Sequence, residues 1–583
     1  MFASMLGFII TLIIAFFLFI AVIASIVSFA EKETYEVEGN SILKMELNYP
    51  VYDRTQKQMF PSFGSSFDIE KALGLNDLLK YLDKAATDDR IKGIYLDLSV
   101  VPTGTAILEE LRQAILDFKE SGKFVVCYAD ILTQTAYYLG SAADHIYLHP
   151  DGMVELKGIS AELLFIKGTL DKLDIDVEVI RAGKYKSAAE PLLYDKMSEA
   201  NREQIELYIN RIWNKMSADI AESRNMTVEE LNKIADDLDA LNAEKATDLF
   251  IVDGLFHPDE MTAELKRLAG IEPDDDLEMV KMGNYVDAKF PEKENKRIAR
   301  EKIAVVYAVG TIMGGEGDDM TIGSERISKA IRKARKDDKV KAIVLRVNSP
   351  GGDALASEVI RREIELANDT KPVIVSMSDL AASGGYWISC SADKILADEM
   401  TLTGSIGVFG LIPNMKGFFN NKLGVTFDYA NTNENSDFPT VSRPLPDYQK
   451  QVLEREIGMI YEDFLSLVAK GRDMTRDEVH ELAQGRVWAA RDAFENNLVD
   501  EIGGMERAIE IAAEMAEIED YRLYELPQQK DPFQQLIEEI SGNAKTRLLV
   551  NELGDNYYIY QYLKKVQDME GTQARLPFEI RLK

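Results

Sequence analysis

Residues 343–367 read IVLRVNSPGGDALASEVIRREIELA, and this stretch sets the fold class of the chain. Ile343–Val347 is a short apolar run rich in β-branched residues, which is typical of a buried strand. Ala354–Ala367 has the spacing of a helix. Between them, Gly351 and Gly352 let the backbone approach a ligand closely and present free N–H groups. A strand, a glycine turn and a helix in this order indicate an α/β fold.

The alternation of strand and helix continues downstream. The pattern predicts a strand at Pro372–Met377, a short helix at Ser383–Ala392 and a strand at Lys394–Ala397. A longer helical stretch, about Asp447–Lys470, follows. Strands that alternate with helices favour a mainly parallel sheet.

The chain contains a tandem repeat. Residues 88–158 align without a gap with residues 337–407, and a chance match of this length is improbable. The first copy therefore predicts the same elements again, together with a closing helix: Ile94–Leu98, Ala106–Lys119, Phe124–Tyr128, Thr135–Ala143, His145–Leu148 and Glu199–Ser223. Two copies of one domain account for most of the chain.

The copies differ at the two glycine-rich turns. The first copy has Pro102-Thr103-Gly104 where the second has Gly351-Gly352-Asp353, and it has Gln134 where the second has Ser383. Ser383 stands at a strand–helix junction among small residues, so it is accessible to a substrate, and nearby N–H groups could stabilise an oxyanion. A nucleophile and a helix-capping serine are both consistent with this position, because Ser is also a preferred N-cap residue.

Composition excludes several classes of protein. The 583 residues are 46% hydrophobic and 28% charged, which is typical of a globular chain rather than of a disordered chain or a polytopic transporter. A formal net charge of −32 disfavours nucleic-acid binding. Two cysteines and four scattered histidines, with no HExxH pattern, give no basis for a disulfide scaffold or a zinc site. We therefore expect no metal and no cofactor.

The N-terminus has a different composition from the body. Residues 1–30 carry no charged side chain, and about 20 apolar residues are enough to span a bilayer. We expect an uncleaved transmembrane anchor, although Ser28-Phe29-Ala30 also fits a small-x-small cleavage site. The few basic residues nearby do not fix the orientation of the anchor.

The combined motifs resemble the signal peptide peptidase A family in its long tandem-domain form. They are SPGGD at 349–353, AASGGYW at 381–387, TGSIGV at 403–408 and YKSA at 185–188. The resemblance implies an α/β fold of tandem duplicated ClpP/crotonase-like domains behind one N-terminal transmembrane helix. The expected division is an anchor at 1–30, a first repeat at 31–300, a second repeat at 301–525 and a tail of unknown role at 526–583.

The resemblance also implies a serine–lysine dyad. Ser383 occupies the nucleophile position of the family and Lys186 the general-base position, with Lys184 as a local rival. The repeat places Gln134 opposite Ser383 and Ser436 opposite Lys186, so each copy holds one half of the dyad. We therefore expect the site at the interface between the copies. Burial of the lysine would lower its pKa into the range that a general base needs.

Three further positions follow from the same resemblance. The backbone N–H groups of Gly352 and Gly384 are expected to form the oxyanion hole, and Ser405 is expected to hydrogen-bond and orient the lysine amine. Asp353 is expected to cap the helix that begins near Ala354 rather than to join the dyad.

The predicted function is that of a membrane-anchored serine endopeptidase that degrades cleaved signal peptides and other unfolded hydrophobic peptides. The family places such enzymes in the bacterial cytoplasmic membrane as single-pass proteins, with the catalytic body on the periplasmic side, and as homotetramers in the tandem form. The expected partners are peptide substrates, the lipid bilayer through residues 1–30 and further copies of the chain. A non-catalytic peptide-binding scaffold and crotonase-type acyl-thioester chemistry are the alternatives, since one fold can host several functions.

Overall fold

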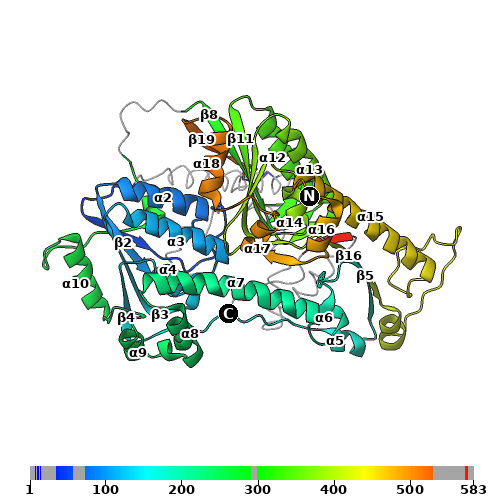
Figure 1. The fold of residues 1–583 in the computed structure, drawn as a ribbon, viewed down its shortest axis with the longest axis horizontal. Coiled ribbons are helices and arrows are strands. Elements are labelled where there is room, and N and C mark those ends of the chain that lie inside the picture. Colours follow the sequence, from blue (N-terminus) through cyan, green and yellow to red (C-terminus); the bar gives the residue numbers. More distant parts are fainter. Residues whose placement is uncertain are drawn as a thin grey trace.

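The computed structural model describes residues 35–56, 72–290, 299–529 and 572–575, together with Gly7, Ile10, Thr11 and Ile14. A parallel sheet from the first half of the chain and a mainly parallel sheet from the second half are joined by a third sheet, to which both halves contribute strands. Figure 1 shows the N-terminal half in blue to green and the C-terminal half in green to orange, with the long helix α7 (Glu199–Ser223) passing below both.

The N-terminal sheet has the strand order β6-β4-β3-β2-β1-β7, and every neighbouring pair is parallel. Its strands are β1 (Ser41–Met45), β2 (Ile91–Asp97), β3 (Phe124–Leu132), β4 (His145–Val154), β6 (Gly254–Leu255) and β7 (Met279–Lys281). The helices and turns of this half are α2 (Leu75–Thr87), α3 (Thr105–Lys119), α4 (Gln134–Gly140), α5 (Lys167–Lys172), α6 (Glu190–Leu193), α7, α8 (Val228–Asp237), η1 (Asp239–Leu241), α9 (Ala243–Asp248), α10 (Pro258–Ala269) and α11 (Met282–Tyr285).

The C-terminal sheet has the order β17-β15-β13-β11-β8-β19, with β14 and β18 attached beside β13. Its strands are β8 (Glu301–Val309), β11 (Val340–Ser349), β13 (Val373–Ala382), β14 (Lys394–Ala397), β15 (Leu402–Gly404), β17 (Val487–Ala489), β18 (Glu501–Ile502) and β19 (Tyr521–Leu526). The helices are α12 (Ser324–Lys336), α13 (Ala354–Asn368), α14 (Gly384–Ser389), η2 (Phe418–Leu423), α15 (Asp447–Gly471), α16 (Arg476–Leu482), α17 (Ala490–Glu495) and α18 (Met505–Met515).

Strand β11 shows why these strands are apolar on both faces. Ile343 and Leu345 belong to the large core under α12, α13 and α14, while Ala342 and Val344 belong to a smaller core under α18. Helices cover both faces of a parallel sheet, so successive residues of one strand are all buried. This burial explains the continuous run Ile343–Val347 in the sequence.

The third sheet joins the two halves, in the order β10-β9-β12-β20-β16-β5. Its strands are β5 (Asp176–Ala182), β9 (Thr311–Met313), β10 (Thr321–Gly323), β12 (Gly351–Asp353), β16 (Val408–Asn414) and β20 (Thr572–Arg575). β5 comes from the first half and pairs antiparallel with β16 of the second along its whole length, from Ala182 opposite Val408 to Asp176 opposite Asn414. This pairing fixes the ends of β5 and β16 beside each other.

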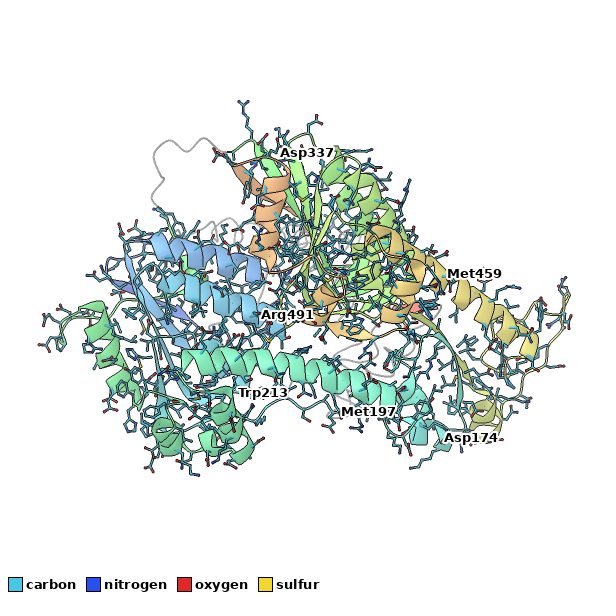
Figure 2. All side chains as sticks on the ribbon, viewed as in Figure 1. Asp174, Met197, Trp213, Asp337, Met459 and Arg491 are labelled. Atoms are coloured by element: carbon cyan, nitrogen blue, oxygen red, sulfur yellow. The ribbon has the colours of Figure 1, made fainter. Side chains whose placement is uncertain are left out.

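Helix α7 adds a second connection between the halves. Its buried residues, such as Ile212 and Met216, pack in the N-terminal core, while its Arg211 forms an ion pair of 2.6 Å with Asp492 of α17. Figure 2 shows Trp213 on this helix beneath the N-terminal half, and Met197, just before the helix, toward the C-terminal half.

The elements expected from the sequence are present. The helix at Glu199–Ser223 and the strand at Lys394–Ala397 have the predicted bounds, and the other elements differ by a few residues at their ends. Among the residues that the structure describes, no helix has both the length and the apolarity needed to cross a bilayer. The expected anchor at residues 1–30 lies almost wholly outside those residues, and so does most of the 526–583 tail.

Candidate active site

The β5–β16 pair carries Lys186 to the C-terminal half. After β5 the chain turns at Gly183, which has a φ of +116°, and the Tyr185 N–H donates to the Gln484 carbonyl at 2.8 Å. A Cβ on Gly183 would lie 2.3 Å from the carbonyl carbon of Gln484, so the close approach of these two loops requires glycine there. The turn directs the Lys186 side chain into the interior, where it is 1% exposed.

Lys186 and Ser383 meet across the two halves of the chain. The Lys186 Nζ lies 2.6 Å from the Ser383 Oγ, 3.0 Å from the Ser405 Oγ and 2.9 Å from the Ser405 carbonyl oxygen. All three residues are buried, so the structure does not show the accessibility that the sequence predicts for Ser383. The structure therefore brings together Ser383, Lys186 and Ser405, for which the family resemblance implies the roles of nucleophile, base and orienting serine.

Burial favours the neutral form of the lysine. It lowers the pKa of Lys186 well below the ordinary value of 10.5, because an ammonium group loses its hydration in the interior. A neutral amine can accept the proton of a serine hydroxyl at this distance, whereas an ammonium cannot.

Ser383 has a constrained backbone at the start of α14. Its φ of 58° and ψ of −112° lie outside the regions that a residue with a Cβ ordinarily adopts, which costs about 1–3 kcal/mol. The Ser383 N–H donates to the Gly404 carbonyl at 2.7 Å, and the Trp387 N–H donates to the Ser383 carbonyl at 2.8 Å. Although Ser383 holds the N-cap position, its side chain makes no capping bond and contacts Lys186 instead. The capping interpretation of this serine is therefore wrong.

Gly352 and Gly384 lie next to each other beside this serine. A Cβ on Gly384 would lie 3.1 Å from the Gly352 nitrogen, and one on Gly352 would lie 2.0 Å from the Ile312 carbonyl oxygen. Side chains at these two positions would therefore collide with backbone. The two glycines are therefore adjacent, as the expected oxyanion hole requires.

The neighbouring polar residues have local roles. The Asp353 Oδ1 accepts the Ala356 N–H at 2.7 Å, so Asp353 caps α13 as expected. In the first copy Gln134, the counterpart of Ser383, accepts from the Gly158 N–H at 2.9 Å and donates to the Gly158 carbonyl at 3.1 Å. In the first copy, these two hydrogen bonds between Gln134 and Gly158 therefore stand where the second copy has Ser383. Ser436, which the repeat places opposite Lys186, is exposed.

Sequence reasoning missed the loop that supports Lys186 from the other side. A Cβ on Gly485 would lie 2.7 Å from both the Cβ and the nitrogen of Lys186, and Gly485 has a φ of +78°. The Ser405 N–H donates to the Arg486 carbonyl at 2.6 Å. The pair Gln484-Gly485 is a turn signal in the sequence, but nothing local to it indicates contact with a segment 300 residues earlier.

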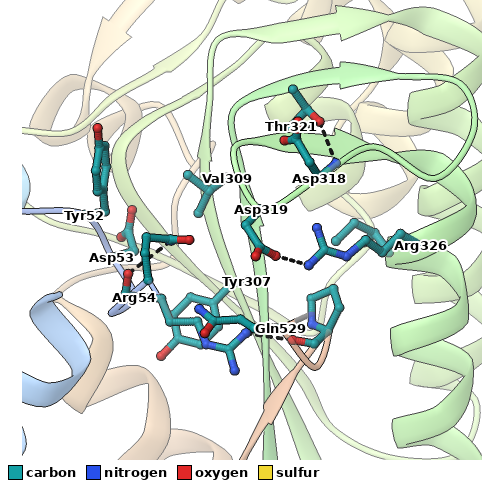
Figure 3. Close-up of a pocket in the computed structure, with 13 residues that line it drawn as sticks. Tyr52, Asp53, Arg54, Tyr307, Val309, Asp318, Asp319, Thr321, Arg326 and Gln529 are labelled. Atoms are coloured by element: carbon teal, nitrogen blue, oxygen red, sulfur yellow. Dashed lines mark hydrogen bonds and ion pairs between the residues drawn. The ribbon is translucent and has the colours of Figure 1, made fainter. Parts of the chain in front are cut away.

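A small pocket lies elsewhere in the molecule. It has a volume of about 20 Å³, enough for a single water molecule, and none of its lining residues belongs to the candidate site. Figure 3 shows Arg54 of the N-terminal segment beside Tyr307 of β8, and Tyr52, Asp53 and Val309 line the same pocket. The pocket is a gap at the junction of the two halves. Within the described residues no group of His, Cys, Asp or Glu could hold a metal ion.

Comparison with known proteins supplies independent information. The sequence model of peptidase family S49 matches two segments, residues 117–272 and 365–519. Protease 4 of Haemophilus influenzae is 35% identical over 86% of this chain and 84% of its own, and the chloroplastic serine protease SPPA of Arabidopsis thaliana is 32% identical over 93% and 78%. A solved structure of a ClpP1 mutant from Listeria monocytogenes is similar at 16% identity and a TM-score of 0.24, covering 35% of this chain and 94% of that one.

Protease relatives match this chain over most of its length, so the chain is a serine protease. Its sheets and helices give it an α/β architecture. The chain belongs to peptidase family S49 and carries two copies of the family domain. The resemblance inferred from its motifs is thereby confirmed at the level of the family.

Proposed function

We propose that the protein is an endopeptidase with a Ser383–Lys186 dyad that cuts signal peptides and other unfolded hydrophobic peptides. The observation that carries the proposal is the distance of 2.6 Å between the Lys186 Nζ and the Ser383 Oγ at a buried position. The lowered pKa of Lys186 supports the same role, since a general base must be neutral before it can accept a proton.

The chemistry follows from these positions. Neutral Lys186 takes the Ser383 proton as the Ser383 Oγ attacks the scissile carbonyl. The N–H groups of Gly352 and Gly384 stabilise the oxyanion, and each such donor is worth about 3–4 kcal/mol in the transition state. The Lys186 ammonium protonates the leaving amine, and water then hydrolyses the acyl-enzyme with Lys186 again as the base. Ser405 keeps the amine in place through its contacts at 2.9 and 3.0 Å.

Peptide hydrolysis by three variants tests the dyad. Ser383→Ala and Lys186→Ala should each lose about 10⁴-fold or more in kcat, because members of a catalytic unit fail together. Lys184→Ala is the matched control, since Lys184 is an exposed lysine in the same turn, and its rate should stay within about twofold of the wild type. Retained cleavage in either dyad variant would contradict the proposal.

A fluorophosphonate probe gives a second measurement that does not depend on the choice of peptide. It should label the wild type at Ser383 and leave the Ser383→Ala protein unlabelled. Label on another serine would show that the nucleophile is elsewhere and would favour a peptide-binding role for this site.

The setting of the enzyme in the cell belongs to the same proposal. We propose residues 1–30 as a single transmembrane anchor in the cytoplasmic membrane, with the body on the periplasmic side. We also propose a homotetramer, and repeats that extend over 31–300 and 301–525. Light scattering on the detergent-solubilised chain measures the assembly, and a mass near that of the 65.5 kDa monomer would contradict the tetramer.

A further inference from the structure

Helix α7 begins beside the turn that carries Lys186. The Gln204 side chain, in the second turn of this helix, donates from its Nε2 to the Tyr185 carbonyl at 3.2 Å and to the Ser187 Oγ at 2.9 Å. Gln204 is 0% exposed. One buried amide therefore contacts the residue before Lys186 and the residue after it.

The same amide also reaches the second half of the chain. The Val487 N–H donates to the Gln204 Oε1 at 3.3 Å, and Val487 is the first residue of β17. Two residues earlier in that segment, Gly485 packs against the backbone of Lys186. Gln204 therefore joins two segments that lie against Lys186, one from each half of the chain. We call Gln204 and these three hydrogen bonds, to positions 185, 187 and 487, the Gln204 clamp.

An amide is the group that position 204 needs. The Tyr185 carbonyl can only accept a hydrogen bond and the Val487 N–H can only donate one, so the side chain between them must have both a donor and an acceptor. Asn201, one helical turn before Gln204, accepts from the Ser187 Oγ at 2.8 Å and from the Gln204 Nε2 at 3.1 Å. A buried polar group that loses its partner is costly, so these bonds favour one arrangement of the two segments.

We propose that Gln204 is a positioning residue of the dyad, which acts through the backbone on both sides of Lys186 and keeps the lysine amine against Ser383 and away from water. This inference rests on the proposed function of the site. Without the Gln204 clamp the two segments can move apart, and a displacement of about 1 Å costs on the order of 10²-fold in rate. Water that enters between them would also hydrate the ammonium form, so the pKa of Lys186 would rise toward its ordinary value.

Charged side chains also lie around this turn, and a test must leave them in place. The Arg181 guanidinium donates to the Lys186 carbonyl at 3.4 Å and lies 3.9 Å from Glu190. Arg486, in the loop before β17, pairs with Glu203 of α7 at 3.1 Å. A neutral substitution at position 204 keeps all of these charges, so a change in the pKa of Lys186 would then come from its hydration.

The first test is Gln204→Met, which keeps the approximate volume of the side chain and removes its hydrogen bonds. We expect kcat for an extended peptide to fall between about 10- and 100-fold with KM unchanged, because the loss lies in the position of the base. The rise of kcat/KM with pH should also move up by about one pH unit or more. A folded Gln204→Met protein with the kcat and the pH rise of the wild type would overturn the proposal.

Ile212→Ala is the matched control on the same helix. Ile212 is buried in the N-terminal core about two turns beyond Gln204, so this variant destabilises α7 without removing the clamp. It should lower the midpoint of thermal unfolding and leave kcat and the pH rise unchanged. Equal losses of kcat in both variants, or a lower kcat in Gln204→Met without a shift of the pH rise, would indicate a merely structural role and overturn the proposal.

Gln204→Glu tests the proposal even if Gln204→Met does not fold. This variant has the length and shape of the wild-type side chain and keeps an acceptor for the Val487 N–H. Once ionised, its carboxylate cannot donate to the Tyr185 carbonyl, so kcat should again fall with KM unchanged. Wild-type kcat with the carboxylate ionised would contradict a positioning role for the amide.

Hydrogen exchange measures the clamp without catalysis. In Gln204→Met, the backbone N–H groups of residues 183–187 and 485–487 should exchange at least about tenfold faster, while those of α13 keep the wild-type rate. Unchanged exchange in both segments would overturn the proposal. Faster exchange with no hydrolysis by any form of the chain would support the clamp and contradict the dyad. Hydrolysis that depends on Ser383 and Lys186 but not on residue 204 would do the reverse.

Discussion

Among the residues that the structure describes, no acidic side chain pairs with Lys186, and burial defines its environment. It is held by Ser383 and Ser405, both neutral, and desolvation is the cause of its lowered pKa. Lysine is rarely fully buried, because burial removes the hydration of its ammonium group. Here the cost is consistent with a function, because the lost hydration produces the neutral amine that the chemistry needs.

The pH dependence of kcat/KM should report this lysine. Activity requires neutral Lys186, so the rate should rise with pH through the pKa of that residue and reach a plateau below 10.5, the ordinary value for lysine. Measurement of kcat/KM across the pH range locates the rise. A rate that rises only near 10.5, or does not rise at all, would contradict a buried base.

The free energy of unfolding should also depend on pH through Lys186. The folded pKa is below the unfolded one, so between the two values the unfolded chain binds more protons, and stability rises as pH rises through that window. Chemical unfolding of the wild type and of Lys186→Met, measured at several pH values, should show the wild type gaining stability relative to the variant as the pH approaches 10.5. A constant difference would mean that the lysine is solvated.

At the scale of elements, short loops rather than long strands and helices hold the site in position. Lys186 lies after β5, Ser383 lies between β13 and α14, and the turn at Gly485 precedes β17. The β5–β16 pairing sets the coarse placement, while the contact of Gly485 with the backbone of Lys186 sets the final distance.

Gly485→Ala should therefore lower kcat. The added Cβ would lie 2.7 Å from the Lys186 nitrogen, so the lysine must shift, and a displacement of about 1 Å costs on the order of 10²-fold in rate. Because Gly485 is not a substrate contact in this proposal, KM should change little. Steady-state kinetics separates the two constants.

Gly424→Ala is the control for this substitution. Gly424 also has a positive φ, +67°, but a Cβ there meets nothing within 4 Å. It therefore carries the same backbone strain without the collision. Equal loss of kcat in both variants would show that strain alone, and not the position of Lys186, is responsible.

At the scale of the whole molecule, a buried ionic cluster fixes the two halves together. Arg346 of β11 is 1% exposed and contacts Asp53 at 2.7 Å, Glu110 of α3, and Asp398 at 3.8 Å. Burial opposes its charge, but the three carboxylates outweigh burial and raise the pKa of Arg346. Two of these carboxylates come from the first half of the chain and the arginine from the second.

A second contact also joins the two halves of the chain. Asp379 of β13 accepts the Ala106 N–H at 3.0 Å and the Ile107 N–H at 3.3 Å, so the second half caps helix α3 of the first. The residue before that helix, Gly104, makes no side-chain cap of its own, and a Cβ there would lie 2.0 Å from the Asp379 carboxyl carbon. The first copy lacks the Gly351-Gly352 pair of the second copy, but its own Gly104 lies at the contact with Asp379.

Removal of Arg346 should destabilise the whole chain. Arg346→Leu leaves three buried carboxylates without their partner, and breaking a buried pair in this way costs about 3–5 kcal/mol. Arg362→Leu removes an exposed arginine that pairs with Glu365 at 2.8 Å, and should cost no more than about 1 kcal/mol. Denaturant unfolding measures both. Equal midpoints for the two variants would show that the cluster does not hold the halves together.

Much of the fold could be predicted because it is local. The Ile343–Val347 strand, the helix after Asp353 and the closing helix at Glu199–Ser223 are each encoded by the spacing of apolar residues and by a turn or cap at their ends. The repeat then revealed which copy had kept the serine and which the lysine, and so predicted a site between the copies. Strand β13 runs on past the predicted end at Met377 to Ala382, next to Ser383.

The sequence by itself determined the elements and the duplication, because these depend on residue type and local spacing. The resemblance of its motifs to a known family then marked Ser383, Lys186, Gly352, Gly384 and Ser405 as candidates. Only the tertiary structure decided that β5 pairs with β16, that Gly485 supports Lys186, that Arg346 joins the halves and that β20 pairs with β12 at Gly352. The physical reason is that each of these contacts joins segments far apart in the chain. Burial, which sets the pKa of Lys186, exists only once those segments have packed.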